Sequence, residues 1–189
     1  MVNFSLEHIS CFLAMTTELE FSFDHPVFGQ ELLGGNGYLA RASWVAKRIR
    51  EDDIFHMQDG TLSQLLFKEV LSSFVAGQYI AAIVLGFSLI ERTVAGRLAF
   101  IGDNDAALAK SEDLLKNAFD RKWLKEEEYD LLNKLRKVRN PIVHFRDPLS
   151  ESRPEVRAAS TAQSTIQILE EDAKCILDAA IRVLGKTAL

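Results

Sequence analysis

The sequence predicts an all-α protein, a soluble antiparallel helical bundle. From position 60 onward the apolar residues recur mostly at spacings of three and four, which is the period of an α-helix, and runs that alternate like a β-strand are scarce. The chain has 189 residues, of which 48% are hydrophobic and 26% are charged. That length and composition suit one folded domain with a single core.

Boundary signals and apolar spacing together predict six helices, at roughly 39–52, 61–76, 79–101, 105–120, 125–139 and 162–186. Gly77 leaves room only for a tight connection, so the second and third of these helices should be antiparallel neighbours at the centre of the bundle. Residues 4–20 have the pattern of a further helix. The His25-Pro26 step and the glycine cluster at 34–37 predict turns, and 147–160, with its prolines and serines, predicts an exposed loop.

Charge and cysteine content narrow the function classes. The net charge of -5 argues against a protein that coats DNA, so any contact with nucleic acid needs a local basic patch. Cys11 and Cys175 are too few for a disulfide framework, and His8 with Cys11 gives only two metal ligands, so no metal or cofactor is expected. The N-terminus lacks a basic signal region and the longest apolar run, 79–90, is too short to span a bilayer. These features predict a cytoplasmic protein with no membrane partner.

A carboxylate interrupts the apolar stripe of the predicted 79–101 helix. Glu91 continues the spacing of Val84, Phe87, Val94 and Leu98, which places it on the inward face. An unpaired buried carboxylate costs several kcal/mol, so the core should supply a cation or hydrogen-bond donors. The alternative is that Glu91 pairs with Arg92 or Arg97 at the rim and closes the end of its helix.

Arg139 is the natural candidate for that cation. It follows Leu132 and Leu135 at helical spacing, so it lies on the inward stripe of the predicted 125–139 helix. A guanidinium can pair with a carboxylate and keep other N–H groups for a phosphate. A purely structural bridge between Glu91 and Arg139 is the alternative.

His144 follows Arg139 by five positions. In a regular helix this offset turns the side chain about 140° away, so the two would not share a face. Pro141 disfavours helical geometry at Asn140, and it therefore predicts a helix end or kink that turns Arg139 and His144 toward one groove. The alternative is that His144 is a packed or solvated residue without a chemical role.

Five cations fall within thirteen residues around this segment, with no acid before Asp147. They are Lys134, Arg136, Lys137, Arg139 and Arg146. Such a cluster can hold a phosphate backbone. Alternatively it is a solvated helix end whose charge complements the helix dipole.

The motif Arg139-Asn140-x-x-x-His144, with Glu91 upstream, resembles the signature of the HEPN superfamily, the "higher eukaryotes and prokaryotes nucleotide-binding" helical domains. The resemblance covers roughly residues 62–185, through the segments 77–82, 89–91, 129–140 and 170–173. It implies a four-helix HEPN-like core over 61–189, preceded by an N-terminal helical extension, 1–60, that packs on the core and has no assigned role.

The resemblance also implies a function. Members dimerise, bring two Arg/His pairs into a shared cleft and, in many cases, cleave RNA without a metal. On this basis Arg139 and His144 are the candidate catalytic residues, with Glu91 and Asn140 in support. The candidate RNA-binding residues are Lys137, Arg146, Arg136 and Lys134. The partners implied are RNA, a second copy of the chain and, for a toxin or phage-defence protein, a cognate neutralising protein. The alternative is a non-catalytic module that binds RNA, a nucleotide or a protein.

Overall fold

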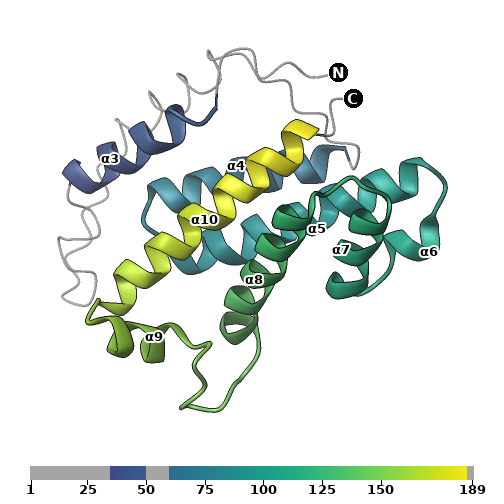
Figure 1. The fold of residues 1–189 in the computed structure, drawn as a ribbon. Coiled ribbons are helices and arrows are strands. Elements are labelled where there is room, and N and C mark those ends of the chain that lie inside the picture. Colours follow the sequence, from purple (N-terminus) through teal and green to yellow (C-terminus); the bar gives the residue numbers. More distant parts are fainter. Residues whose placement is uncertain (1–34, 50–59, 187–189) are drawn as a thin grey trace.

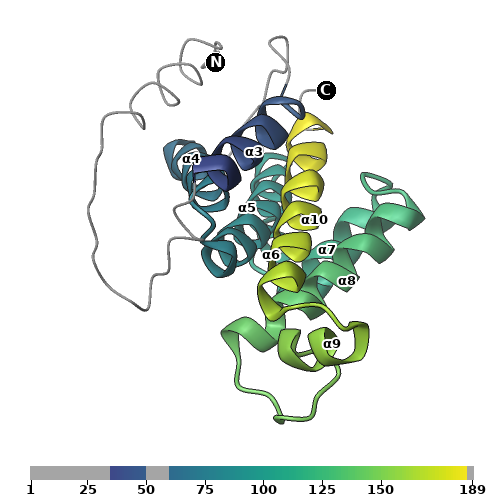
Figure 2. The ribbon, with the colours of Figure 1, turned by 90° about the vertical axis from the view of Figure 1, so that its left-hand side faces the viewer.

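A computed structural model describes residues 35–49 and 60–186 of the chain. Every regular element in these two ranges is a helix, which confirms the all-α prediction (Figures 1 and 2). The predicted helix at 4–20, the His25-Pro26 turn and the pair His8 and Cys11 lie outside the described residues. The described helices are α3 (Gly35–Ala46), α4 (Thr61–Val75), α5 (Tyr79–Phe100), α6 (Asn104–Ala107), α7 (Ser111–Asp120), α8 (Glu126–Val143), α9 (Pro154–Thr161) and α10 (Thr165–Gly185).

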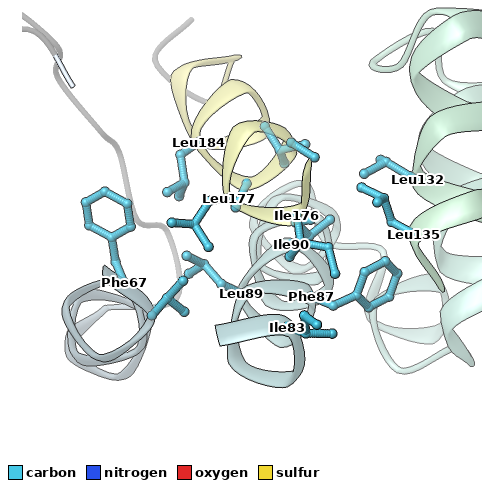
Figure 3. Packing of buried hydrophobic residues seen from close by; sticks show 14 of the residues in the cluster. Phe67, Ile83, Phe87, Leu89, Ile90, Leu132, Leu135, Ile176, Leu177 and Leu184 are labelled. Carbon is cyan, nitrogen blue, oxygen red and sulfur yellow. The ribbon is translucent and has the colours of Figure 1, made fainter. Parts of the chain in front are cut away.

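The helix α5 lies at the centre of the bundle. It packs against both α4 and α10, and Figure 3 shows its fully buried residues Phe87, Leu89 and Ile90 surrounded by side chains from neighbouring helices. Gly86 allows α10 to come close, because a Cβ at this position would lie 2.7 Å from Cγ2 of Ile176. Removal of this apolar surface from water is the main contribution to the stability of the bundle.

The tight connection predicted between α4 and α5 is confirmed. Gly77 has φ 77°, a left-handed conformation that glycine adopts without a steric cost. Its N–H donates to Phe74 O at 2.9 Å, and the N–H of Gln78 donates to Ser73 O at 2.8 Å. These bonds satisfy carbonyls at the end of α4 and turn the chain directly into α5.

The helix α8 presents its apolar side to α5. Leu132 and Leu135 are buried, and Figure 3 shows them facing Phe87. At the N-terminal end of α8, the Glu128 carboxylate accepts the Lys125 N–H at 2.8 Å, which caps the first turn. Helix α8 runs to Val143, four residues beyond the predicted end, so Pro141 lies in its last turn.

The single helix predicted at 105–120 is wrong, since the chain forms α6 and α7 there. The Asp103 side chain accepts the Ala106 N–H at 3.1 Å and caps the four-residue α6. Arg121 forms an ion pair with the same carboxylate, so the end of α7 returns to the start of α6. This contact joins residues far apart along the segment, and local spacing could not have predicted it.

The exposed loop predicted for 147–160 is wrong in its second half, which forms α9. Pro154 occupies the first turn of this helix, where its missing N–H has no cost. Arg157 pairs with both carboxylate oxygens of Asp172, a residue of α10 that is only 8% exposed, and so fixes α9 on α10. Ala162 then takes a left-handed φ of 55°. Ser164 caps α10 with a capping box, and the helix begins at Thr165, three residues later than predicted.

The glycine cluster was predicted as a turn, but α3 begins within it at Gly35. Arg41, 9% exposed, holds this helix in place by donating from Nε to Val75 O at 2.9 Å, in the last turn of α4. A Cβ at Gly37 would lie 3.0 Å from Nη1 of Arg41, so the glycine leaves room for the guanidinium. A tertiary contact thus offsets the poor helix propensity of the cluster.

By length and composition, α5 would suffice to cross a membrane. Half of its apolar window is buried inside the bundle, as expected for the central helix of a packed domain. This apolarity is therefore weak evidence for a membrane span.

Candidate functional site

Glu91 of α5 and Arg139 of α8 form an ion pair between the two helices. Nη2 of Arg139 donates to Oε1 of Glu91 at 2.8 Å. The side chain of Arg139 is 15% exposed and that of Glu91 is 22% exposed, so each charge compensates the other where water has limited access. The predicted partnership of these residues is confirmed. Arg97, an alternative partner, lies instead over the Trp123 ring, with its Cζ 4.3 Å from the ring centroid.

Two further contacts orient the guanidinium of Arg139. Its Cζ lies 5.1 Å from the centroid of the Phe87 ring, within the range of a cation–π interaction. Its Nη1 lies 3.4 Å from Oδ1 of Asn140, a long hydrogen bond. Phe87 precedes Glu91 by about one helical turn, so the same face of α5 supplies both the carboxylate and the aromatic ring. Together with the ion pair, the contacts with Asn140 and Phe87 fix the orientation of the Arg139 guanidinium.

His144 lies at the C-terminal cap of α8. Its backbone is extended, with φ −125° and ψ 137°, yet its N–H still donates to Asn140 O at 2.9 Å, the helical hydrogen bond. Because α8 continues past Pro141, the offset of about 140° from Arg139 remains. The helix end predicted at Asn140 is therefore wrong, and a regular continuation of α8 does not turn the two side chains toward one groove of a single chain. The His144 side chain is exposed and, within the described ranges, makes no hydrogen bond or ion pair.

The cationic cluster divides into neutralised and free members. Arg136 pairs with Glu112 of α7 at 3.0 Å, and its side chain is 17% exposed. Lys134, Lys137 and Arg146 are exposed, and among the residues that the structure describes they have no acidic partner. Across the described residues, exposed cations without an acidic partner therefore extend from the middle of α8 to just beyond its end, and Arg136 is no longer one of them.

Exposed apolar side chains occur at the same end of the molecule. Val143 is 44% exposed, Phe145 89% and Leu149 84%. Apolar spacing alone did not mark these residues as functional, although the position of Phe145 between His144 and Arg146 in the sequence is a signal that could have done so. An aromatic residue directly beside a cation is a common arrangement in nucleic-acid binding surfaces.

No metal centre is apparent in the described part of the chain, where no three His, Cys, Asp or Glu side chains gather. A small pocket between Arg97, Trp123 and Lys186 has a volume of about 20 Å³, room for roughly one water. It is too small for a nucleotide. The candidate site is the end of α8, which combines a fixed arginine, an exposed imidazole, free cations and an exposed aromatic ring.

Comparisons of the chain with protein-family models, with curated proteins and with solved structures find no match.

Proposed function

We propose that the protein is a metal-independent endoribonuclease of the HEPN type, which acts as a homodimer through the C-terminal end of α8. The observation that supports this most directly is the Glu91–Arg139 ion pair. It fixes the arginine that begins the motif Arg139-Asn140-x-x-x-His144, while His144, Lys137 and Arg146 are exposed on the same segment of the chain. A held arginine and a free imidazole are the two groups that RNA cleavage by this route requires.

In the proposed reaction His144 is the general base. Its imidazole takes the proton of a ribose 2′-hydroxyl, the 2′-oxygen bonds to the adjacent phosphorus, and the bond from phosphorus to the 5′-oxygen breaks. The leaving oxygen takes a proton from water, and the upstream product ends in a 2′,3′-cyclic phosphate. Arg139 stabilises the negative charge of the phosphorane-like transition state. Lys137 and Arg146, with Lys134, position the backbone, while Arg136 contributes less because Glu112 neutralises it.

A second copy of the chain completes the site in this proposal. Arg139 and His144 leave α8 on different sides, so one chain alone does not direct both at the same phosphate. Two α8 ends related by a two-fold axis bring two sets of these residues to one cleft. Light scattering should then report about twice the 21.2 kDa mass of the chain, and a monomer at micromolar concentration would exclude this arrangement.

The decisive experiment is RNA cleavage in the presence of EDTA by wild type and by His144→Ala. Wild type should release fragments with 2′,3′-cyclic phosphate ends, and loss of the general base should slow cleavage by about 10²–10⁴-fold. Fold and molar mass should not change, because the imidazole is exposed. Lys110→Ala, which removes an exposed side chain just before α7, is the matched control and should cleave at the wild-type rate. Equal cleavage by all three proteins would point to a contaminating nuclease.

A second candidate function has its own observation in support. The guanidinium of Arg139 is committed to Glu91 and Asn140 and is largely buried, which suits a structural bridge. The protein would then be a non-catalytic module that binds RNA, a nucleotide or a protein. In that case wild type cleaves nothing, and His144→Ala changes only binding.

The family resemblance also bears on the role of the protein in the cell. It suggests a cytoplasmic toxin or phage-defence protein opposed by a cognate neutralising protein. Induced expression of wild type and of His144→Ala tests this, since only wild type should arrest growth.

A further inference from the structure

Phe145 is the most exposed large apolar side chain among the described residues, at 89%. It lies directly after the end of α8, between the exposed side chains of His144 and Arg146. We propose that Phe145 is a stacking platform for one unpaired base of a single-stranded RNA, next to the phosphates that the cations of the α8 end contact. This inference rests on the RNA-directed function proposed above.

The backbone around Phe145 is held at both ends. On one side the N–H of His144 remains in the hydrogen-bond pattern of α8. On the other side Oδ1 of Asp147 accepts the Leu149 N–H at 2.8 Å, and the Asp147 carbonyl accepts the Ser150 N–H at 3.0 Å. The aromatic ring is thus presented on a short structured segment, which lowers the entropy that binding must overcome.

An exposed phenylalanine ring is unfavourable in water and offers a flat apolar face. Nucleobases have faces of the same kind, and their stacking on aromatic side chains does not depend on sequence. In the interior of a duplex these faces are covered by neighbouring base pairs, so Phe145 can stack on an unpaired base but not on a base inside a duplex. The ligand is accordingly single-stranded RNA.

The surrounding charges favour RNA over a protein partner. Arg146 follows the ring directly, and the exposed Lys137 and Lys134 lie about two and three turns before it along α8. A cation directly beside an aromatic ring, with further cations along the same helix, suits a strand in which phosphates and bases alternate. The exposed Val143 and Leu149 would suit an apolar protein surface, so contact with a protein is the competing outcome that the test must detect.

The test measures binding of a fluorescein-labelled 12-nucleotide strand made of 2′-O-methyl RNA, which cannot form the cyclic phosphate. The strand is used alone and annealed to its complement. Phe145→Ala should weaken binding of the single strand by roughly 5–150-fold, the loss expected for one stacked base. Duplex binding should change much less. Phe145→Trp, which keeps an aromatic ring, should bind the single strand with the affinity of wild type. Phe145→Leu, which keeps apolar bulk without a ring, should not reach that affinity.

Phe100→Ala is the matched control, since Phe100 is also exposed, at 77%, but lies at the end of α5. It should bind both RNAs as wild type does. If Phe145→Ala binds the single strand as tightly as wild type does, the stacking role of Phe145 is wrong and the proposed function stands. If wild type binds neither RNA, both the stacking role and the proposed function are wrong. A change in molar mass on Phe145→Ala, with no specific loss for single strands, would assign the ring to a protein interface instead.

Discussion

Breaking the Glu91–Arg139 ion pair should destabilise the fold by an amount that lies between the values for surface and buried pairs. Exposed pairs contribute about 0–1 kcal/mol, and removal of one partner from a fully buried pair costs about 3–5 kcal/mol. With side-chain exposures of 22% and 15%, we expect Glu91→Ala to cost about 2–3 kcal/mol, because the guanidinium of Arg139 loses its counter-charge where water is scarce. Arg139→Ala should cost about 0.5–1 kcal/mol more, since it also loses the contact with the Phe87 ring.

A double-mutant cycle separates the ion pair from these other effects. Urea unfolding of wild type, the two single variants and the double variant gives the interaction free energy, which we expect to be about 1–2 kcal/mol for residues in direct contact. The pair of Arg136 and Glu112 is the internal control, because it uses the same helix but its carboxylate side chain is 67% exposed. Glu112→Ala should change the free energy of unfolding by less than about 1 kcal/mol.

Two outcomes would refute this reasoning. Single-variant losses of only a few tenths of a kcal/mol would mean that water reaches the Glu91–Arg139 pair freely. Strict additivity in the cycle would mean that the two charges do not interact, whatever the distance between them.

Two further perturbations test the packing of α5 and the pH dependence of the fold. Gly86→Ala should lower the free energy of unfolding in urea by about 1–2 kcal/mol, because the new methyl group would lie 2.7 Å from a buried side chain of α10. Gly185→Ala, where a Cβ would meet nothing within 4 Å, should leave this free energy unchanged or raise it slightly. Equal effects of the two substitutions would contradict the close approach of α5 and α10 at Gly86. Burial alone would raise the pKa of Glu170, but the effects that lower it prevail, the largest being the hydrogen bond from Lys174, and the net pKa falls below 4.5. The folded pKa lies below the unfolded one, so this carboxylate contributes stability that is present above about pH 4.5 and is lost as the pH falls through the folded pKa. Glu170→Gln should therefore be less stable than wild type at pH 7, and its melting temperature should fall less steeply between pH 7 and pH 3. The same loss of stability in acid for both proteins would contradict the lowered pKa of Glu170.

Local patterns in the sequence were enough to predict the fold class and the central ion pair. Helical spacing identified α4 and α5 within one residue of their bounds, and Gly77 marked the turn between them. The same spacing placed Glu91 and Arg139 on inward faces, and a buried charge needs a partner wherever it lies. The logic extends to Asp172, which falls four residues after Ile168 and four before Ile176 and pairs with Arg157, although it was not selected beforehand.

Contacts between distant segments decided the rest. An ion pair joins Asp103 and Arg121 at the two ends of the predicted 105–120 helix, Arg157 fixes α9 on α10, and Glu112 neutralises Arg136. No local period encodes these three pairings. The orientation of His144 depended on whether α8 ends at Pro141 or passes it. A proline in the last turn costs only the helical partner of one carbonyl, so α8 continues to Val143. The offset of a regular helix then separates His144 from Arg139 by about 140°. Sequence periodicity specifies which side chains face inward, while the pairing of charges across helices follows from the tertiary packing that brings those faces together.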